Sequence, residues 1–190
     1  MLRNSYIVIF VSIILVVFSF ACGRKNTKTT NTFNMNFFTG LETLDPVMSN
    51  APATIWVLNQ VMEPLVEYDK SGKLVPALAR SFEVSDDALT YTFHLRSGIR
   101  YQNDECISPN RTVTASDVKY CLERVNNPSS KTRGLWVFRD KIKGAESYSQ
   151  KTSGSIEGLK VLNDSTIQII LDKPFAPFLS LLTMTYAFIY

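Results

Sequence analysis

The stretch LVPALARSFEVSDDALTYTFHLRSGIRY, residues 74–101, decides the fold of this 190-residue chain. It contains two short runs with an apolar pattern, at residues 82–84 and 91–95. Between them, residues 85–87 are Ser-Asp-Asp, whose side chains hydrogen-bond their own backbone in turns. The stretch is therefore predicted to form a two-stranded meander that is closed by Ser97-Gly98.

The second run alternates apolar and polar residues, which is the pattern of a half-buried strand. Its apolar positions are Tyr91, Phe93 and Leu95, and its polar positions are Thr90, Thr92 and His94. His94 is the one histidine of the chain. Its place on the polar face explains it as an exposed strand residue, because a lone side chain is weak support for catalysis.

The regions before this stretch predict two strands and a helix. Residues 33–39 are expected to form a first strand, and residues 65–68 a second one that a tight turn at 69–72 connects to the meander. Between the strands, a helix begins near Pro52 and ends at Glu63-Pro64, because proline presets a first helical turn and disfavours helix in the residue before it. The mostly apolar face of this helix is expected to carry Ile55, Leu58, Asn59 and Met62.

The regions after the stretch continue this mixture. A polar loop at residues 102–113 precedes a helix whose start, residues 114–117, has capping-box spacing. One face of this helix is expected to carry Val118, Cys121, Leu122 and Val125.

Three more elements are predicted towards the end of the chain. Residues 144–148 form a short helix, and residues 156–162 and 166–171 form a hairpin around Asn163-Asp164. An apolar, helical segment begins at Phe178. Strands and helices thus follow one another along the chain, which indicates an α+β fold.

Several of these segments together resemble the extracytoplasmic solute-binding proteins of peptide transporters, the oligopeptide- and dipeptide-binding family. The ordered series is more specific than any single short motif, and it extends from about Leu44 to Leu182. The matching segments are Leu44-Asp45-Pro46, Val75-Pro76-Ala77-Leu78-Ala79, Phe82-Glu83-Val84-Ser85, Tyr91-Thr92-Phe93-His94-Leu95-Arg96-Ser97-Gly98, Thr114-Ala115-Ser116-Asp117-Val118 and Ile142-Lys143-Gly144-Ala145-Glu146-Ser147-Tyr148.

The resemblance implies that the α+β fold is part of a two-lobed architecture like that of periplasmic binding proteins. Residues 33–51 would begin the main lobe, residues 52–171 would form a small mixed domain, and residues 172–190 would return towards the main lobe. Family members are much longer, so we interpret the chain as a truncated, N-terminal portion. Apolar side chains beyond Leu171 would then be exposed, because a missing lobe would cover them.

The N-terminus predicts export. Residues 1–21 combine a basic start with an apolar run that is shorter than the roughly 20 residues of a spanning helix, as in a signal peptide. Ser19-Phe20-Ala21-Cys22 resembles the lipobox of bacterial lipoproteins, which implies that Cys22 is lipidated; residues 22–32 would be a flexible tether. The alternative is an uncleaved membrane anchor. Both interpretations give an exported protein, periplasmic or extracytoplasmic, that is held at a membrane.

Two places are candidates for ligand contact. By resemblance, Ser49, Asn50 and Ala51 lie at the ligand cleft and contribute backbone contacts, although Asn50 stands where an acidic residue can meet the amino terminus of a peptide. The alternative is a polar loop before a helix. Trp136, after a loop at residues 129–134, is the second candidate, because binding pockets favour aromatic side chains. The alternative for Trp136 is burial in the core.

The sequence argues against catalysis, metal binding and nucleic-acid binding. Charged residues make up 19% of the chain and form no block of one sign, and the formal net charge is +3. No phosphate-binding loop or nucleophile elbow occurs, so we predict no enzyme and no cofactor. Cys22, Cys106 and Cys121 form no C-x-x-C pair, and one histidine is too few to predict a zinc site. Cys106 and Cys121 are either a disulfide or two unrelated thiols.

The predicted function is the peptide-binding component of an ABC transporter. Its partners would be a peptide ligand, the permease subunits of the transporter and the membrane, through a lipid anchor. The motifs report the scaffold rather than the ligand. A nickel- or oligosaccharide-binding member of the family, or a truncated lipoprotein remnant without binding activity, therefore stays an alternative.

Overall fold

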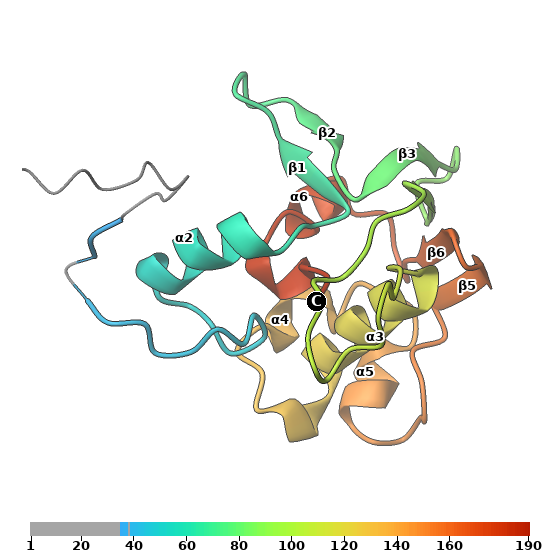
Figure 1. Ribbon diagram of the computed structural model, residues 1–190. Helices are drawn as coiled ribbons and strands as arrows, with labels where there is room; N and C mark the ends of the chain where they lie inside the picture. The colour runs from blue at the N-terminus through green and yellow to red at the C-terminus, as the bar shows by residue number, and fades with distance from the viewer. Residues whose placement is uncertain (1–34, 38) are drawn as a thin grey trace, which may run out of the picture. The chain divides into compact units, whose positions relative to one another are not determined.

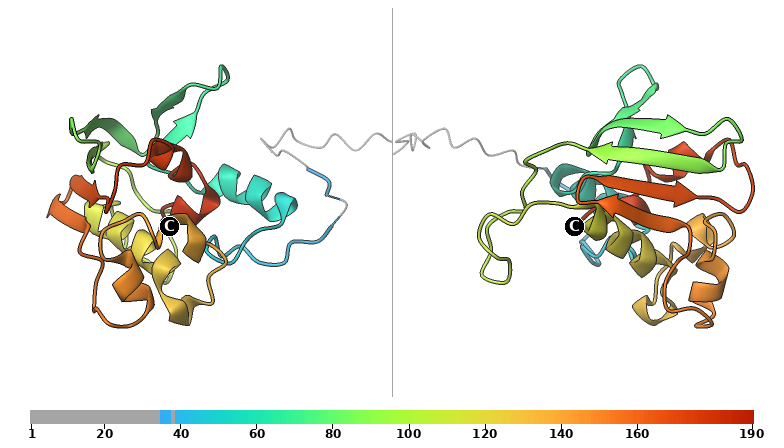
Figure 2. Two further views of the ribbon diagram at one scale, coloured as in Figure 1. Left: turned by 180° about the vertical axis from the view of Figure 1, so that it is seen from behind. Right: turned by 90° about the vertical axis from the view of Figure 1, so that its right-hand side faces the viewer.

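A four-stranded antiparallel sheet organises the computed structural model, which describes residues 35–37 and 39–190. The strand order is β3-β4-β6-β5, so the hairpins β3–β4 and β5–β6 join through β4 and β6. The right-hand view of Figure 2 shows these strands side by side. They are β3 (Ala79–Val84), β4 (Thr90–Leu95), β5 (Leu159–Asn163) and β6 (Thr166–Ile170).

The meander predicted at residues 74–101 is confirmed as the β3–β4 hairpin. Asp87 shapes its turn, because Asp87 Oδ1 accepts hydrogen bonds from the Ser85 hydroxyl at 2.5 Å and from the Leu89 N–H at 3.0 Å. Ala88 between them has a φ of 55°, in the left-handed region. The Ser-Asp-Asp turn thus forms through the local hydrogen bonds that its composition predicts.

The alternation of the second run is also confirmed. On β4 the apolar positions are at most 4% exposed, and the polar positions lie on the other face and are half-buried. His94 is thus on the polar face as predicted, but it is half-buried rather than exposed. Helix α3 (Ala115–Asn126) lies against the β5–β6 end of the sheet, as Figure 2 shows. The apolar positions of β4 are Tyr91, Phe93 and Leu95.

Helix α3 begins and ends where the sequence predicts. Its capping box is present: the Thr114 N–H and the Thr114 hydroxyl both donate to Asp117 Oδ2, at 2.8 Å and 2.9 Å. The helix stops before Asn127-Pro128. Its predicted face is buried throughout: Val118, Cys121, Leu122 and Val125.

A two-stranded ribbon and several short helices complete the fold (Figure 1). The turn of the ribbon forms as predicted: Asp69 Oδ1 accepts from the Ser71 and Lys73 N–H groups, and Gly72 has a φ of 78°. The predicted hairpin at residues 156–171 and the predicted short helix at 144–148 are confirmed as β5–β6 and α5. The remaining elements are α2 (Pro52–Val61), β1 (Val66–Tyr68), β2 (Leu74–Pro76), η1 (Pro128–Ser130), α4 (Leu135–Phe138), α5 (Ala145–Ser149), α6 (Phe178–Leu181) and η2 (Thr185–Ala187).

The segment after Leu171 contradicts the expected exposure of its apolar side chains. Helix α6 forms as predicted, but Phe178 is fully buried, with its ring 4.8 Å from that of Tyr91 and 6.5 Å from that of Phe138, measured between centroids. These aromatic contacts bring the segment into the same core as the sheet. Residues 37–190 therefore form one compact unit. Also buried in this segment are Leu182, Tyr186, Ala187, Phe188 and Ile189.

Two predictions near the beginning of the described chain are wrong in part. Residues 35–37 and 39–40 contain no strand and pair with none of the described strands; residues 33, 34 and 38 lie outside the described range. Helix α2 forms, but of its expected apolar face only Leu58 is buried. The helix packs through residues nearer its N-terminal end than expected, and Trp56 and Val61 are exposed. The buried residues of α2 are Ala53, Thr54 and Leu58.

The polar loop at residues 102–113 carries one of the two cysteines that the structure describes, and helix α3 carries the other. Backbone hydrogen bonds close its base, from the Tyr101 N–H to the Arg111 carbonyl at 3.0 Å and from the Val113 N–H to the Ile99 carbonyl at 2.9 Å. Cys106 is exposed on this loop, whereas Cys121 is buried on α3, and both thiols are free. The disulfide alternative is therefore wrong, and the two thiols are unrelated.

Candidate functional site

The predicted ligand segment, Ser49-Asn50-Ala51, connects a turn to helix α2. The turn closes through a hydrogen bond from the Met48 N–H to the Asp45 carbonyl at 3.1 Å. Asn50 is exposed, whereas Ser49 is only 2% exposed. The Ala51 carbonyl accepts the first helical hydrogen bond of α2, from the N–H of Ile55 at 3.0 Å, so it is already engaged within the chain.

The loop that precedes α4 lies directly beside this segment. The Arg133 N–H donates to the Val47 carbonyl at 2.9 Å, and the Thr132 hydroxyl donates to the same oxygen at 3.3 Å. The guanidinium of Arg133 donates through Nη1 to Asn50 Oδ1 at 2.6 Å. The structure thus brings together the two regions that the sequence marks as ligand-contacting, the 49–51 segment and the approach to Trp136.

Trp136 lies on α4 and is 58% exposed. The sequence leaves Trp136 either as an exposed aromatic at the ligand cleft or as a buried core residue, and the structure shows the side chain exposed. Its backbone carbonyl accepts a hydrogen bond from Lys141 Nζ at 3.3 Å, which ties the short helix to the residues that follow it. Contact between Trp136 and a ligand stays a prediction.

Gly134 joins the Arg133 loop to α4 at a point of close approach. A Cβ atom at this position would lie 2.5 Å from Cδ1 of Tyr186, a distance that real Cβ contacts essentially never reach. Glycine is therefore required here, because any larger residue would displace the tyrosine ring or the loop.

A second arginine fixes the turn from the other side. Arg124 on α3 donates to Asp45 through two nitrogens, Nη1 to Oδ1 at 2.7 Å and Nη2 to Oδ2 at 2.5 Å. It also donates to the Tyr190 hydroxyl at 2.6 Å and lies 5.3 Å from the centre of that ring. Asp45 Oδ1 in turn accepts from the Val47 N–H at 3.3 Å. One carboxylate thus joins α3 to the turn that carries Ser49 and Asn50.

Electrostatics favour the charged forms of Asp45 and Arg124 in this cluster. The hydrogen bonds from Arg124 lower the pKa of Asp45 below its ordinary value, and the bonds to Asp45 raise the pKa of Arg124. Burial raises the pKa of Tyr190 to about 12. At neutral pH the cluster therefore contains one carboxylate, one guanidinium and one neutral phenol.

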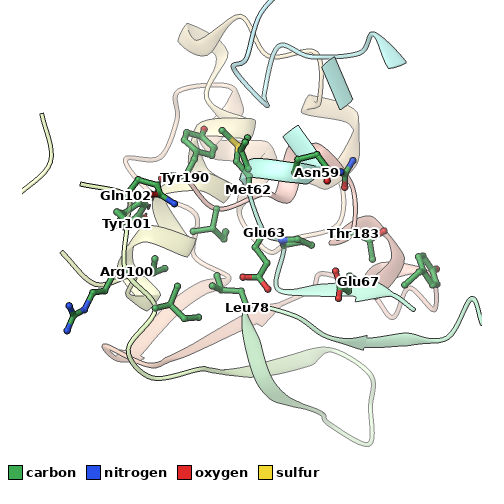
Figure 3. A pocket seen from close by; sticks show the side chains of 17 residues that line it. Asn59, Met62, Glu63, Glu67, Leu78, Arg100, Tyr101, Gln102, Thr183 and Tyr190 are labelled. Atoms are coloured by element: carbon green, nitrogen blue, oxygen red, sulfur yellow. Dashed lines mark hydrogen bonds between the residues drawn. The ribbon is translucent and has the colours of Figure 1, made fainter. Parts of the chain in front are cut away.

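A separate cavity of about 740 Å³ lies between the end of α2, the ribbon strand β1, the base of the 102–113 loop and the last residues of the chain. Figure 3 shows its side chains: Met62 and Glu63 lie in the middle, Tyr101 and Tyr190 to one side, and Thr183 to the other. Its carboxylates are Glu63, which is paired with Arg96 at 2.6 Å, and Glu67. None of the predicted site residues Ser49, Asn50, Ala51 and Trp136 lines it.

The part of the chain that the structure describes contains no group of three or more His, Cys, Asp or Glu residues that could hold a metal ion. His94 lies on the half-buried face of the sheet, with Nδ1 3.4 Å from the Thr166 hydroxyl and Nε2 3.6 Å from Glu83 Oε1. Burial raises the pKa of the Cys121 thiol to about 12, so this cysteine stays protonated at neutral pH.

The predicted signal peptide, Cys22 and the tether at residues 22–32 lie outside the described residues. Lipidation of Cys22 stays a prediction. Within residues 35–37 and 39–190, none of the helices combines the length and the apolar character that crossing a bilayer requires.

Sequence reasoning missed Arg124 and Arg133, which hold the candidate segment. Arg124 is 79 residues from Asp45, and Arg133 is 83 residues from Asn50, so no local spacing connects the partners. The one available signal was Asp45 itself, which belongs to the Leu44-Asp45-Pro46 match. A charged residue within such a match indicates that a residue of opposite charge elsewhere in the chain pairs with it.

Comparison with known proteins places these residues in a familiar scaffold. The family described as Bacterial extracellular solute-binding proteins, family 5 Middle, matches residues 73–190. Heme-binding protein A of Haemophilus influenzae is 36% identical over 134 residues, which are 69% of this chain and 23% of that protein. The dipeptide-binding protein of Escherichia coli is 34% identical over 162 residues, which are 82% of this chain and 26% of that protein.

Solved structures share the fold as well. The structure of Listeria monocytogenes OppA bound to peptide has a TM-score of 0.69 at 28% identity, and the match covers 77% of this chain and 28% of that one. The chain thus spans about a quarter of the length of the relatives that it matches. The fold class predicted from the sequence, an α+β part of a periplasmic peptide-binding architecture, is confirmed.

Proposed function

Since the chain belongs to family 5 of the bacterial extracellular solute-binding proteins, we propose that it acts as the substrate-binding component of an ABC transporter and captures peptides outside the cytoplasmic membrane. The observation that carries the proposal is its likeness to a peptide-bound relative over 77% of the chain. The named dipeptide-binding relative supports the same ligand class. The described residues supply an exposed, polar segment at Asn50 and an exposed Trp136 beside one loop.

The same scaffold serves other ligands, so the ligand has to be tested directly. One relative is named for heme binding, and the sequence leaves nickel, oligosaccharides and a non-binding remnant as alternatives. A peptide ligand is favoured by the chemistry of Asn50, because the exposed NH₂ of its amide can donate to the main-chain carbonyls that all peptides share.

Thermal unfolding of the purified 190-residue chain tests the proposal. The probes are tri-alanine, hemin, Ni²⁺ and a linear oligosaccharide, each added separately. A ligand that binds only the folded state at a hundredfold excess over its dissociation constant stabilises that state by about 2.7 kcal/mol. We expect tri-alanine to raise the midpoint. If only hemin, Ni²⁺ or the oligosaccharide raises the midpoint, that compound rather than a peptide is the ligand class. If the transition is cooperative and no probe shifts it, the chain is a remnant without binding activity.

The membrane attachment is part of the proposal. Cys22 would carry the lipid, residues 22–32 would tether the domain to it, and the permease subunits would receive the loaded protein. Labelling cells with a radioactive fatty acid checks this anchor. The wild-type chain is expected to be labelled and to sediment with membranes, and Cys22→Ser to lose the label. A Cys22→Ser variant that keeps the label would show that another residue is modified.

A further inference from the structure

Arg133 presents its charge in a fixed position. Its backbone N–H is bound to the Val47 carbonyl at 2.9 Å, and its guanidinium is bound through Nη1 to Asn50 Oδ1 at 2.6 Å. Both side chains are exposed. An arginine that is anchored at both ends of its side chain loses little additional conformational freedom when it binds a ligand, which favours affinity.

The charge of Arg133 is not neutralised within the described part of the chain. None of the carboxylates there lies within salt-bridge distance of it, whereas neighbouring Arg139 pairs with Glu146 at 3.0 Å. The nearest acidic side chain in the 45–51 segment, Asp45, is engaged by Arg124. Arg133 therefore has N–H donors left for a negatively charged partner, and arginine matches the planar, two-oxygen geometry of carboxylates.

Asn50 adds N–H donors beside Arg133 and brings no negative charge that would attract a cationic ligand group. Because its Oδ1 accepts from Arg133, the free polar group of the side chain is its NH₂, which donates to oxygen. An acidic residue at this position would pair with Arg133 and neutralise its charge. Asn50 thus leaves the positive charge of Arg133 available to an anion.

The N-terminus of α2 follows Asn50 directly and has the same preference. This ten-residue helix has no side-chain cap at Ala51, and its N-terminal end carries a partial positive charge. The buried hydroxyls of Ser49 and Thr54, 2% and 1% exposed as whole residues, have no hydrogen-bond partner among the described atoms.

We propose that Arg133 and Asn50, together with the N-terminus of α2, form a site that recognises a carboxylate of the ligand, the carboxyl terminus of a bound peptide. The inference rests on the proposed function and sharpens it, because it names the end of the peptide that this part of the protein holds. The other source of the same chemistry is an acidic side chain within the peptide.

Peptides with blocked ends test the site on the 190-residue chain by titration calorimetry. The probes are tri-alanine, N-acetylated tri-alanine, C-amidated tri-alanine and C-amidated Ala-Asp-Ala. We expect amidation to weaken binding by about tenfold, the loss of one charge-assisted contact, and acetylation to leave it within about twofold. C-amidated Ala-Asp-Ala that binds as tightly as tri-alanine would move the assignment to an acidic side chain and overturn the assignment to the carboxyl terminus.

Variants connect the preference to the named residues. Arg133→Gln and Asn50→Asp are both expected to bind the free and the amidated peptide equally, the first by removing the charge and the second by pairing with it. Arg139→Gln is the matched control, since Arg139 is an exposed arginine of the same region whose charge is already paired. It is expected to keep the tenfold preference. The thermal midpoint of each variant without ligand shows that it folds, and Arg133→Lys is the milder alternative if Arg133→Gln does not.

The outcomes separate the two proposals. If free and amidated tri-alanine bind equally to the wild-type chain, the carboxylate site is wrong while peptide binding stands. If Arg133→Gln weakens both peptides by the same factor, Arg133 supports the fold and does not read the carboxylate. If no peptide binds at all, the proposed function fails together with the site.

Discussion

Two arginines of this molecule have opposite relations to the rest of the chain. Arg124 on α3 is three-quarters buried and is bound to both oxygens of Asp45 and to Tyr190. Arg133, nine residues later, is exposed and is bound to neutral groups, the Asn50 amide oxygen and the Val47 carbonyl. Both hold the 45–51 segment, but only the first does so with a compensated charge.

The difference distinguishes an arginine that stabilises the fold from an arginine whose charge remains available to a ligand. A guanidinium with a bidentate carboxylate partner has its donors used and its charge neutralised, so it contributes to the folded state. A guanidinium that is positioned by neutral acceptors keeps its charge for a ligand. The residue type is the same, and the partner that folding brings to it decides the role.

Removing Arg124 is expected to have the largest effect on stability. Arg124→Met would leave Asp45 partly buried without its partner, and would lower the free energy of unfolding by about 2 kcal/mol. Urea unfolding measures this loss. Arg96→Met is the matched control, because Arg96 also contacts both carboxylate oxygens of its partner, Glu63, through Nη2 at 2.6 and 2.7 Å, but both side chains are nearly half exposed. The control should cost about 0.5 kcal/mol; equal losses would contradict the assignment.

Acid should weaken the Arg124 contact specifically. The bonds from Arg124 lower the pKa of Asp45 in the folded state, so the carboxylate form stabilises the fold. This contribution is complete above the ordinary carboxyl pKa of about 4 and is lost as the pH falls through the lowered value of the folded state. The stability difference between wild type and Arg124→Met should therefore shrink between pH 7 and pH 2. A difference that stays constant over this range would show that Asp45 does not contribute through its charge.

Replacing Arg133 is expected to change stability little. Arg133→Gln removes an exposed side chain whose charge has no partner in the described chain, and should alter the free energy of unfolding by less than about 0.5 kcal/mol. The same variant loses the preference for a free carboxyl terminus. Urea unfolding and peptide titration on one preparation measure both quantities. A stability loss as large as that of Arg124→Met would make the two arginines equivalent.

The smallest effect is expected from the cavity beside β1. Glu67→Gln removes a carboxylate that lines the cavity but leaves the Arg133 region intact. Affinity for tri-alanine should stay within about twofold of the wild-type value. A larger decrease in calorimetric affinity would place the ligand in the cavity of Figure 3 rather than beside Asn50.

The elements that the sequence predicts well depend on neighbouring residues. The Asp87 turn, the capping box at Thr114 and the alternation of β4 depend on residues that are close in sequence. The local sequence pattern is therefore enough to predict them. The family resemblance added the architecture. The candidate segment at residues 49–51 came from that resemblance, and the geometry around it comes from distant partners that spacing does not reveal.

What the sequence could not predict depends on contacts between distant segments. The apolar residues around Phe178 were expected to be exposed, and they are buried because the ring of Tyr91, far back in the chain, is available to them. The buried side of α2 is likewise decided by what it packs against, so its apolar spacing alone gave the wrong face. Arg133 carried no signal at all before folding placed it beside Asn50.

The contact between Gly134 and the ring of Tyr186 has a mechanical consequence. Because not even a methyl group fits between them, the loop that carries Arg133 cannot slide over η2; in a close-packed interior the two shift together. A displacement of the Arg133 loop is therefore expected to move residues 185–187 with it. The absence of a side chain at Gly134 thus couples the loop that carries Arg133 to the residues of η2 near the end of the described chain.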